Sequence, residues 1–214
     1  MNLAVWVERQ ARRRAEAPAL AAGERVHADW ATFAGRTAAV AAGLGNDFGL
    51  SPGDRVAIVM YNRPEYLEAL FAIWHAGMVA VPVNARLHRD EIGYILDHCG
   101  AAVAVTDGDH AGEVESLIGT VPSLHAVVVA PGERWHRLAG SGSMPLVERR
   151  PDDGAWLFYT SGTTGRPKGA VLTHRNLLMM SLSYFADIDQ IGAGDSVVHA
   201  APISHGSGLY GLPH

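Results

Sequence analysis

The chain has 214 residues, 48% of them hydrophobic, with a formal net charge of -5 at pH 7 and an isoelectric point near 6.1. This composition argues against a disordered chain and offers no strongly basic surface, so we expect no nucleic-acid partner. The single cysteine, Cys99, excludes an internal disulfide framework and favours an unreactive buried thiol, which predicts a cytoplasmic protein.

Neither a signal peptide nor a transmembrane segment is predicted. The basic cluster of the N-terminus follows its short apolar stretch, which is the reverse of the order in a signal peptide. The most apolar segment, 69–83, is interrupted by His75, Gly77 and Pro82, and it is shorter than the ~20 residues that a bilayer span needs.

In chain order, an amphipathic helix opens the sequence and an alanine-rich helix is expected over 30–44. Strands and helices then alternate. Strands are predicted over 55–61, 78–84, 101–107 and 124–130, and helices over 62–77, with Asn62 as its cap, 88–100 and 111–121. Nearly continuous Val, Ala and Ile strands separated by helices predict an α/β fold, with a doubly wound, mostly parallel sheet over roughly 50–130 and helices on both faces.

The second part of the chain has a different organisation. Segment 131–154 loses periodicity and gains Gly, Pro, Ser and charge, so it is predicted to be a surface connection. Over 155–174, two β-type runs flank a Gly- and Thr-rich stretch, which predicts a hairpin. In 175–214 we expect a helix and then the strand "VVHAAP", which precedes His205.

The hairpin loop has the residue types of a phosphate-binding site. Backbone N–H groups of a Gly-rich turn can converge on an anion, and four hydroxyl residues and Lys168 lie within the same few positions. Pro167 separates Arg166 from Lys168 and a strand follows, so the stretch is not a Walker A loop. A plain flexible hairpin tip accounts for the glycines and the proline but gives no reason for the hydroxyls and the lysine.

The stretch "YTSGTTGRPKGAVLTHRN" closely resembles the phosphate-binding signature of the adenylate-forming superfamily, which includes acyl-CoA synthetases and peptide-synthetase adenylation domains. The resemblance covers the whole chain. "GDRVAIVMYNRPEYLEALFAIWHAGMVAVPVNARL" looks like an early part of the family's large N-terminal domain, and "APISHGSGLYG" looks like its histidine-containing loop beside the acyl pocket.

The resemblance implies ATP-dependent activation of a carboxylic acid to an acyl-adenylate, followed by transfer to coenzyme A, with Mg²⁺ accompanying ATP. It implies that His205 lines the acyl site and moves between the two half-reactions, and that the Thr160 hydroxyl lies near Mg²⁺. The implied ATP-phosphate ligands are Thr160, Ser161, Gly162, Thr163, Thr164, Gly165 and Lys168.

Other histidines receive structural predictions. His199 is expected to be packed or hydrogen-bonded, His75 is expected to lie in the core, and the cluster beginning at His88 is expected to form a charged helix N-terminus. For His174 the sequence leaves open a capping or packing role and a functional one. No pair of histidines or cysteines has zinc spacing, so Mg²⁺ is the only metal expected.

Members of the superfamily are much longer, and their adenine, ribose and hinge motifs and their C-terminal domain with its catalytic lysine are absent from residues 1–214. We therefore expect the N-terminal part of an AMP-binding domain, inactive alone, from a fatty acyl- or aryl-CoA synthetase. Two alternatives stay open: a carrier-protein-charging adenylation domain, and a non-catalytic nucleotide-binding remnant. Exposed apolar surface after Val197 would favour self-association.

Overall fold

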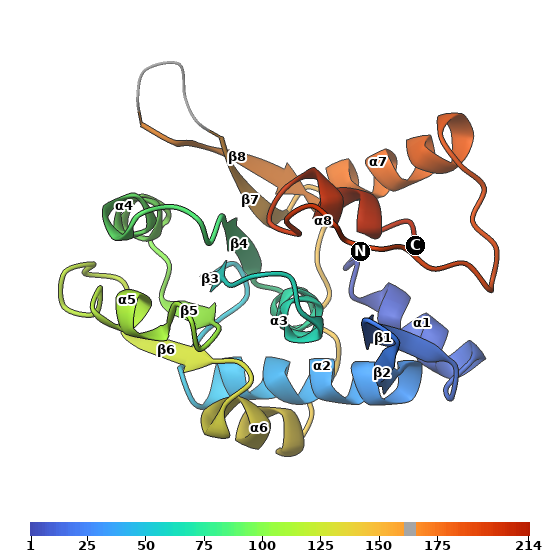
Figure 1. Cartoon of the computed structure of the whole chain (residues 1–214), viewed down its shortest axis with the longest axis horizontal. Helices are drawn as coiled ribbons and strands as arrows, with labels where there is room; N and C mark the ends of the chain where they lie inside the picture. The colour runs from blue at the N-terminus through green and yellow to red at the C-terminus, as the bar shows by residue number, and fades with distance from the viewer. Residues whose placement is uncertain (161–165) are drawn as a thin grey trace.

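The computed structural model describes residues 1–160 and 166–214, and its centre is a six-stranded sheet with the order β6-β5-β3-β4-β7-β8 (Figure 1). Four strands form its parallel part: β3 (Arg55–Val59), β4 (Val79–Val83), β5 (Val103–Thr106) and β6 (Ala126–Val129). β7 (Gly154–Thr160) runs parallel to β4, and β8 (Lys168–Thr173) is antiparallel to β7. The predicted mostly parallel α/β fold is confirmed.

The helices cover this sheet and extend beyond it. They are α1 (Val5–Arg13), α2 (Trp30–Asn46), α3 (Pro64–His75), α4 (Arg89–Cys99), α5 (Ala111–Glu115), α6 (Glu133–Gly140), α7 (His174–Asp187) and α8 (Gly206–Gly211). Among the described residues, no helix combines the length and the hydropathy that crossing a bilayer requires.

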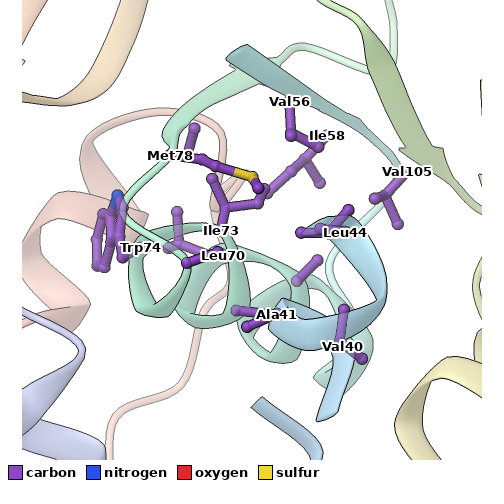
Figure 2. Packing of buried hydrophobic residues seen from close by; sticks show 14 of the residues in the cluster. Val40, Ala41, Leu44, Val56, Ile58, Leu70, Ile73, Trp74, Met78 and Val105 are labelled. Atoms are coloured by element: carbon purple, nitrogen blue, oxygen red, sulfur yellow. The ribbon is translucent and has the colours of Figure 1, made fainter. Parts of the chain in front are cut away.

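The sheet separates two hydrophobic cores because successive side chains of a strand point to opposite faces. On one face, Val56 and Ile58 of β3 pack with residues of α2 and α3 (Figure 2). On the other face, Ala57 and Val59 pack with α4 and α5. The connection after β3 therefore leads to one face and the connection after β4 to the other. In doubly wound sheets, such a reversal opens a crevice at the carboxyl ends of the strands.

Several elements differ from the predictions. A small antiparallel sheet of β1 (Pro18–Ala22) and β2 (Arg25–Asp29) was not predicted, and α5 ends at Glu115 rather than near Val121. The 131–154 segment contains α6, whose Trp135 and Leu138 are buried in the main core. Two apolar residues three positions apart are too few to stand out as a helical pattern in the sequence.

Two further predictions are wrong. Residues 197–202 form no strand, because no described strand lies beside them to pair with their backbone. Asn62 does not cap α3, since the residue before this helix is Arg63 and no side chain makes a capping hydrogen bond there. The two differences meet at Asn62, because its side chain forms hydrogen bonds with the backbone of 199–203 rather than with the N-terminus of α3.

Candidate functional site

The β7–β8 hairpin presents the two described members of the predicted phosphate site opposite each other. Thr160 and Lys168 are cross-strand partners at the end of the hairpin where β7 stops and β8 begins, and both residues are exposed. Lys168 is also the only lysine of the chain, and all of its other strongly basic side chains are arginines. The predicted ligands between them, Ser161, Gly162, Thr163, Thr164 and Gly165, lie outside the described residues.

Tyr159 anchors the first arm of the hairpin to α4. Its hydroxyl lies 2.7 Å from Nδ1 of His98, and its ring lies across the backbone of Gly169, its partner on β8. A Cβ at Gly169 would lie 3.0 Å from Cζ of the Tyr159 ring, which is tighter than ordinary contact, so this approach favours glycine. Burial raises the pKa of Tyr159 above its usual value, so the phenol remains a neutral hydrogen-bonding group.

The second arm contacts the same helix. The Arg166 guanidinium carbon lies 5.6 Å from the centroid of the Tyr94 ring, and Tyr94 stacks on His98 with ring centroids 5.5 Å apart. Tyr94 and His98 are four residues apart and so lie on one face of α4. Both arms of the hairpin are thus held by one helix. The sequence analysis missed these contacts, and the i,i+4 aromatic pair was the available signal.

His205 lies next to the hairpin in space, although it comes after the hairpin in the chain. It directly precedes α8 and is half-buried, and its ring centroid is 5.8 Å from that of Phe158 on β7. Phe158 is two residues from Thr160. The fold therefore brings the predicted acyl-site histidine close to the strand that leads into the predicted phosphate loop.

A cavity of about 330 Å³ lies at the carboxyl ends of β3 and β4, where the strand order reverses. Its wall is formed by 60–62 after β3, by 84–86 after β4, and by His199, Ala200, Pro202 and Ser204. The segment that precedes His205 thus lines the crevice that a doubly wound sheet is expected to have.

The other histidines considered in the sequence analysis make packing or hydrogen-bonding contacts. His174 is fully buried at the start of α7, where Thr173 provides the cap and the N–H of Leu3 donates to His174 Nδ1 at 3.4 Å. Burial, with Arg149 and the N-terminal amino group nearby, lowers the pKa of His174 to about 4. The ring is therefore neutral at pH 7.

His199 is hydrogen-bonded as predicted, with Nδ1 2.8 Å from the Ser207 hydroxyl. His75 is buried as predicted, and its Nε2 lies 2.9 Å from the carbonyl of Met144. Burial lowers the pKa of His199. The cluster beginning at His88 forms the charged N-terminus of α4, as predicted, and the His88 N–H donates to the Glu91 carboxylate at 3.0 Å. In 1–160 and 166–214, no three His, Cys, Asp or Glu side chains gather to hold a metal ion.

Comparison of the sequence with known proteins identifies a family. The AMP-binding enzyme family matches residues 7–213. The chain is 37% identical over 208 residues to a feruloyl-CoA synthase of an Amycolatopsis species, an alignment of 97% of this chain and 40% of that protein. It is 32% identical over 171 residues to the benzoate-CoA ligase of Thauera aromatica, with 78% of this chain and 32% of the relative aligned.

Structural comparison agrees. The inhibitor-bound crystal structure of the N-terminal domain of FACL13 from Mycobacterium tuberculosis superposes with a TM-score of 0.89 and 26% identity, covering 99% of this chain and 54% of that one. The chain spans about 40% of the length of the feruloyl-CoA synthase. The match over nearly its whole length, together with the hairpin and the fold, shows that the chain belongs to the AMP-binding enzyme family.

Proposed function

We propose that the protein carrying this chain uses ATP to activate a carboxylic acid as an acyl-adenylate and then transfers the acyl group to coenzyme A. The observation that supports this most is the β7–β8 hairpin, which pairs a threonine with the only lysine of the chain where β7 stops and β8 begins, within a family match over 7–213. The two relatives named above are a feruloyl-CoA synthase and a benzoate-CoA ligase, and both names join a carboxylic acid to CoA.

The chemistry requires control of charge, since a carboxylate must approach an anionic triphosphate. Hydroxyl, backbone N–H and ammonium donors reduce this repulsion and hold the reacting groups in line. We assign the role of ATP-phosphate ligands to Thr160, Lys168 and the five residues between Thr160 and Arg166, which are Ser161, Gly162, Thr163, Thr164 and Gly165. A lysine at this end acts as a point charge on the phosphates.

The exposed Thr160 hydroxyl suits Mg²⁺, which takes oxygen ligands from protein, phosphate and water. When bound with ATP, the ion neutralises charge on the phosphate oxygens. His205 beside Phe158 is proposed to line the acyl site, because an imidazole and an aromatic ring together offer a polar edge and an apolar wall. A cytoplasmic location is proposed from Cys99, a half-buried free thiol whose pKa burial raises to about 11.

The proposed activity is tested with the complete gene product. Acid-dependent release of pyrophosphate and formation of a CoA thioester are followed for aromatic, short-chain and long-chain fatty acids. We expect both products from at least one class of acid. Pyrophosphate release with no thioester from CoA would favour a carrier protein as acceptor, and no release with any acid would contradict the proposal.

The phosphate site is tested on the chain itself. Because Lys168 is the only lysine, an amine-selective reagent can modify it and the N-terminal amino group alone, and mass spectrometry separates the two. We expect ATP with Mg²⁺ to slow modification of Lys168, whereas adenosine, which has no phosphate, gives no protection. Equal rates with ATP and with adenosine would remove Lys168 from the site.

A further inference from the structure

Asn62 makes three hydrogen bonds to a segment more than 130 residues away. Its Nδ2 donates to the carbonyl oxygens of His199 and Ala201, both at 2.8 Å, and its Oδ1 accepts from the N–H of Ile203, also at 2.8 Å. Both N–H groups of the side-chain amide are used, so its donor capacity is filled.

The three contacts converge on a single side-chain amide. Residues 199, 201 and 203 of an extended strand would be too far apart for one amide to reach all three, so the segment curves around Asn62, with a bend at 201 and a turn over 203–205. No described strand pairs with this segment. The Asn62 amide therefore supplies hydrogen-bond partners that no described strand provides, and it holds the curved segment beside the residues that follow β3 and β4.

The restraint is passed on toward His205 by close packing. The N–H of His205 donates to the carbonyl of Pro202 at 3.1 Å, so His205 lies in a turn that begins within the held segment. A Cβ at Gly208 would come within 2.0 Å of the Ile203 carbonyl oxygen, which leaves no room for movement of α8 toward Ile203. The His199–Ser207 hydrogen bond joins the two ends of the same unit.

We propose that Asn62 is a positioning residue that fixes the 199–205 segment over the carboxyl ends of β3 and β4 and so sets the place of the His205 ring beside Phe158. Asn62 is exposed, and its hydrogen bonds cross the molecule rather than cap α3. Its removal should therefore free the segment without opening the core. The consequence for catalysis rests on the proposed function, but the restraint itself does not.

The restraint is measured by residue-resolved amide hydrogen exchange on the chain. In Asn62→Ala the N–H of Ile203 loses its acceptor, and we expect its protection to fall about tenfold, the equivalent of one net hydrogen bond, together with that of His205. Asn46→Ala, which removes an exposed asparagine at the end of α2, serves as the matched control and should leave both amides unchanged. Unchanged protection of Ile203 and His205 in Asn62→Ala would overturn the proposal.

Asn62→Asp separates hydrogen bonding from side-chain shape. The carboxylate keeps an acceptor for Ile203 but places an oxygen against the carbonyls of His199 and Ala201, so we expect protection to fall at pH 7 and to recover as the carboxylate is protonated. Protection factors, rather than raw rates, are compared because exchange itself depends on pH. This variant decides the question if Asn62→Ala does not fold, and wild-type protection at pH 7 would count against the proposal.

The catalytic consequence is measured in the complete gene product. In Asn62→Ala, kcat for acid-dependent pyrophosphate release should fall about ten- to a hundredfold, as expected for a misplaced group, while the KM for ATP stays the same. A wild-type protein that releases no pyrophosphate overturns the proposed function and leaves the exchange result to decide the role of Asn62. A wild-type level of kcat in the variant limits Asn62 to holding the segment and overturns its effect on His205.

Discussion

The two halves of the central sheet differ in how completely they are covered. In the β3–β6 half, helices cover both faces, and β3, β4 and β5 are buried almost throughout. In the region from β7 to α8, most of β8 is exposed, and so are Met179, Leu182 and Phe185 of α7. Val198 beyond this helix is 85% exposed.

The comparison separates the part of the chain that contains most of the buried core from the part that carries the proposed site residues. The covered half contains the main cores, whereas Thr160, Lys168 and His205 all belong to the other region. An apolar helix face that stays exposed marks a surface for contact with further protein. The chain spans about 40% of the length of the feruloyl-CoA synthase it resembles, so relatives have ample additional chain to cover such a face.

The largest expected effect concerns whether residues 1–214, which include the region from β7 to α8, suffice for the proposed chemistry. We expect residues 1–214 alone to show no measurable acid-dependent pyrophosphate release, because a phosphate loop without partners for the rest of ATP binds without alignment. Loss of alignment removes roughly 7 to 11 kcal/mol of assistance. The assay compares the chain with the complete gene product at equal concentration, and turnover by residues 1–214 near that of the complete protein would show that the catalytic groups have been misplaced.

A matched pair of substitutions tests the difference in burial. Leu70→Ala in α3 removes a fully buried side chain, and we expect it to lower the free energy of unfolding by about 2 to 5 kcal/mol. Leu182→Ala in α7 makes the same chemical change at a 51% exposed side chain, and about 0.5 kcal/mol or less is expected. Urea unfolding measures both, and equal losses would mean that α7 is packed as tightly as α3.

The buried His174, which accepts a hydrogen bond from Leu3, is expected to make the folded chain less stable in acid. Its pKa is about 4 in the folded chain against an ordinary 6.5, so the unfolded chain binds more protons between these values. Stability should therefore fall as pH drops from 6.5 toward 4, by up to about 3 kcal/mol. His174→Asn keeps an acceptor for Leu3 without titrating, so it should reduce this slope in pH-dependent urea unfolding. An unchanged slope would assign the acid sensitivity elsewhere.

Lys168→Ala tests the chemistry of the exposed region without touching the covered one. A charge-assisted contact to phosphate is worth on the order of 1.5 to 3 kcal/mol, so the kcat/KM for ATP should fall about ten- to a hundredfold in the complete gene product. The free energy of unfolding should stay the same because Lys168 is exposed. Unchanged ATP kinetics would contradict its proposed role.

The smallest effect concerns the exposed face of α7. We expect residues 1–214 to self-associate weakly through Leu182 and Phe185, which are 51% and 43% exposed. Sedimentation at rising concentration should show this, and the double variant Leu182→Lys, Phe185→Glu should remain monomeric. Concentration-independent sedimentation of the wild-type chain would refute the prediction.

Local sequence patterns were sufficient to predict much of the molecule. Apolar runs of Val, Ala and Ile predicted β3 to β6, because a strand buried on both faces needs apolar residues at every position. The Gly-rich stretch between two β-type runs predicted the hairpin, and the buried surroundings of His75 agreed with its place on an apolar helix. In α6, by contrast, the burial of Trp135 depends on packing that has no strong local pattern.

The sequence by itself determined the order and type of the main elements and the residue types of the proposed phosphate site, because these depend on neighbours along the chain. Only the tertiary structure decided which distant groups meet. It placed Tyr94 and His98 against the hairpin, and it directed Asn62 to the backbone of 199–203 instead of the end of α3. An asparagine amide bonds equally well to a nearby helix end or a distant segment, so its partner is fixed by which backbone groups the fold leaves unpaired within reach.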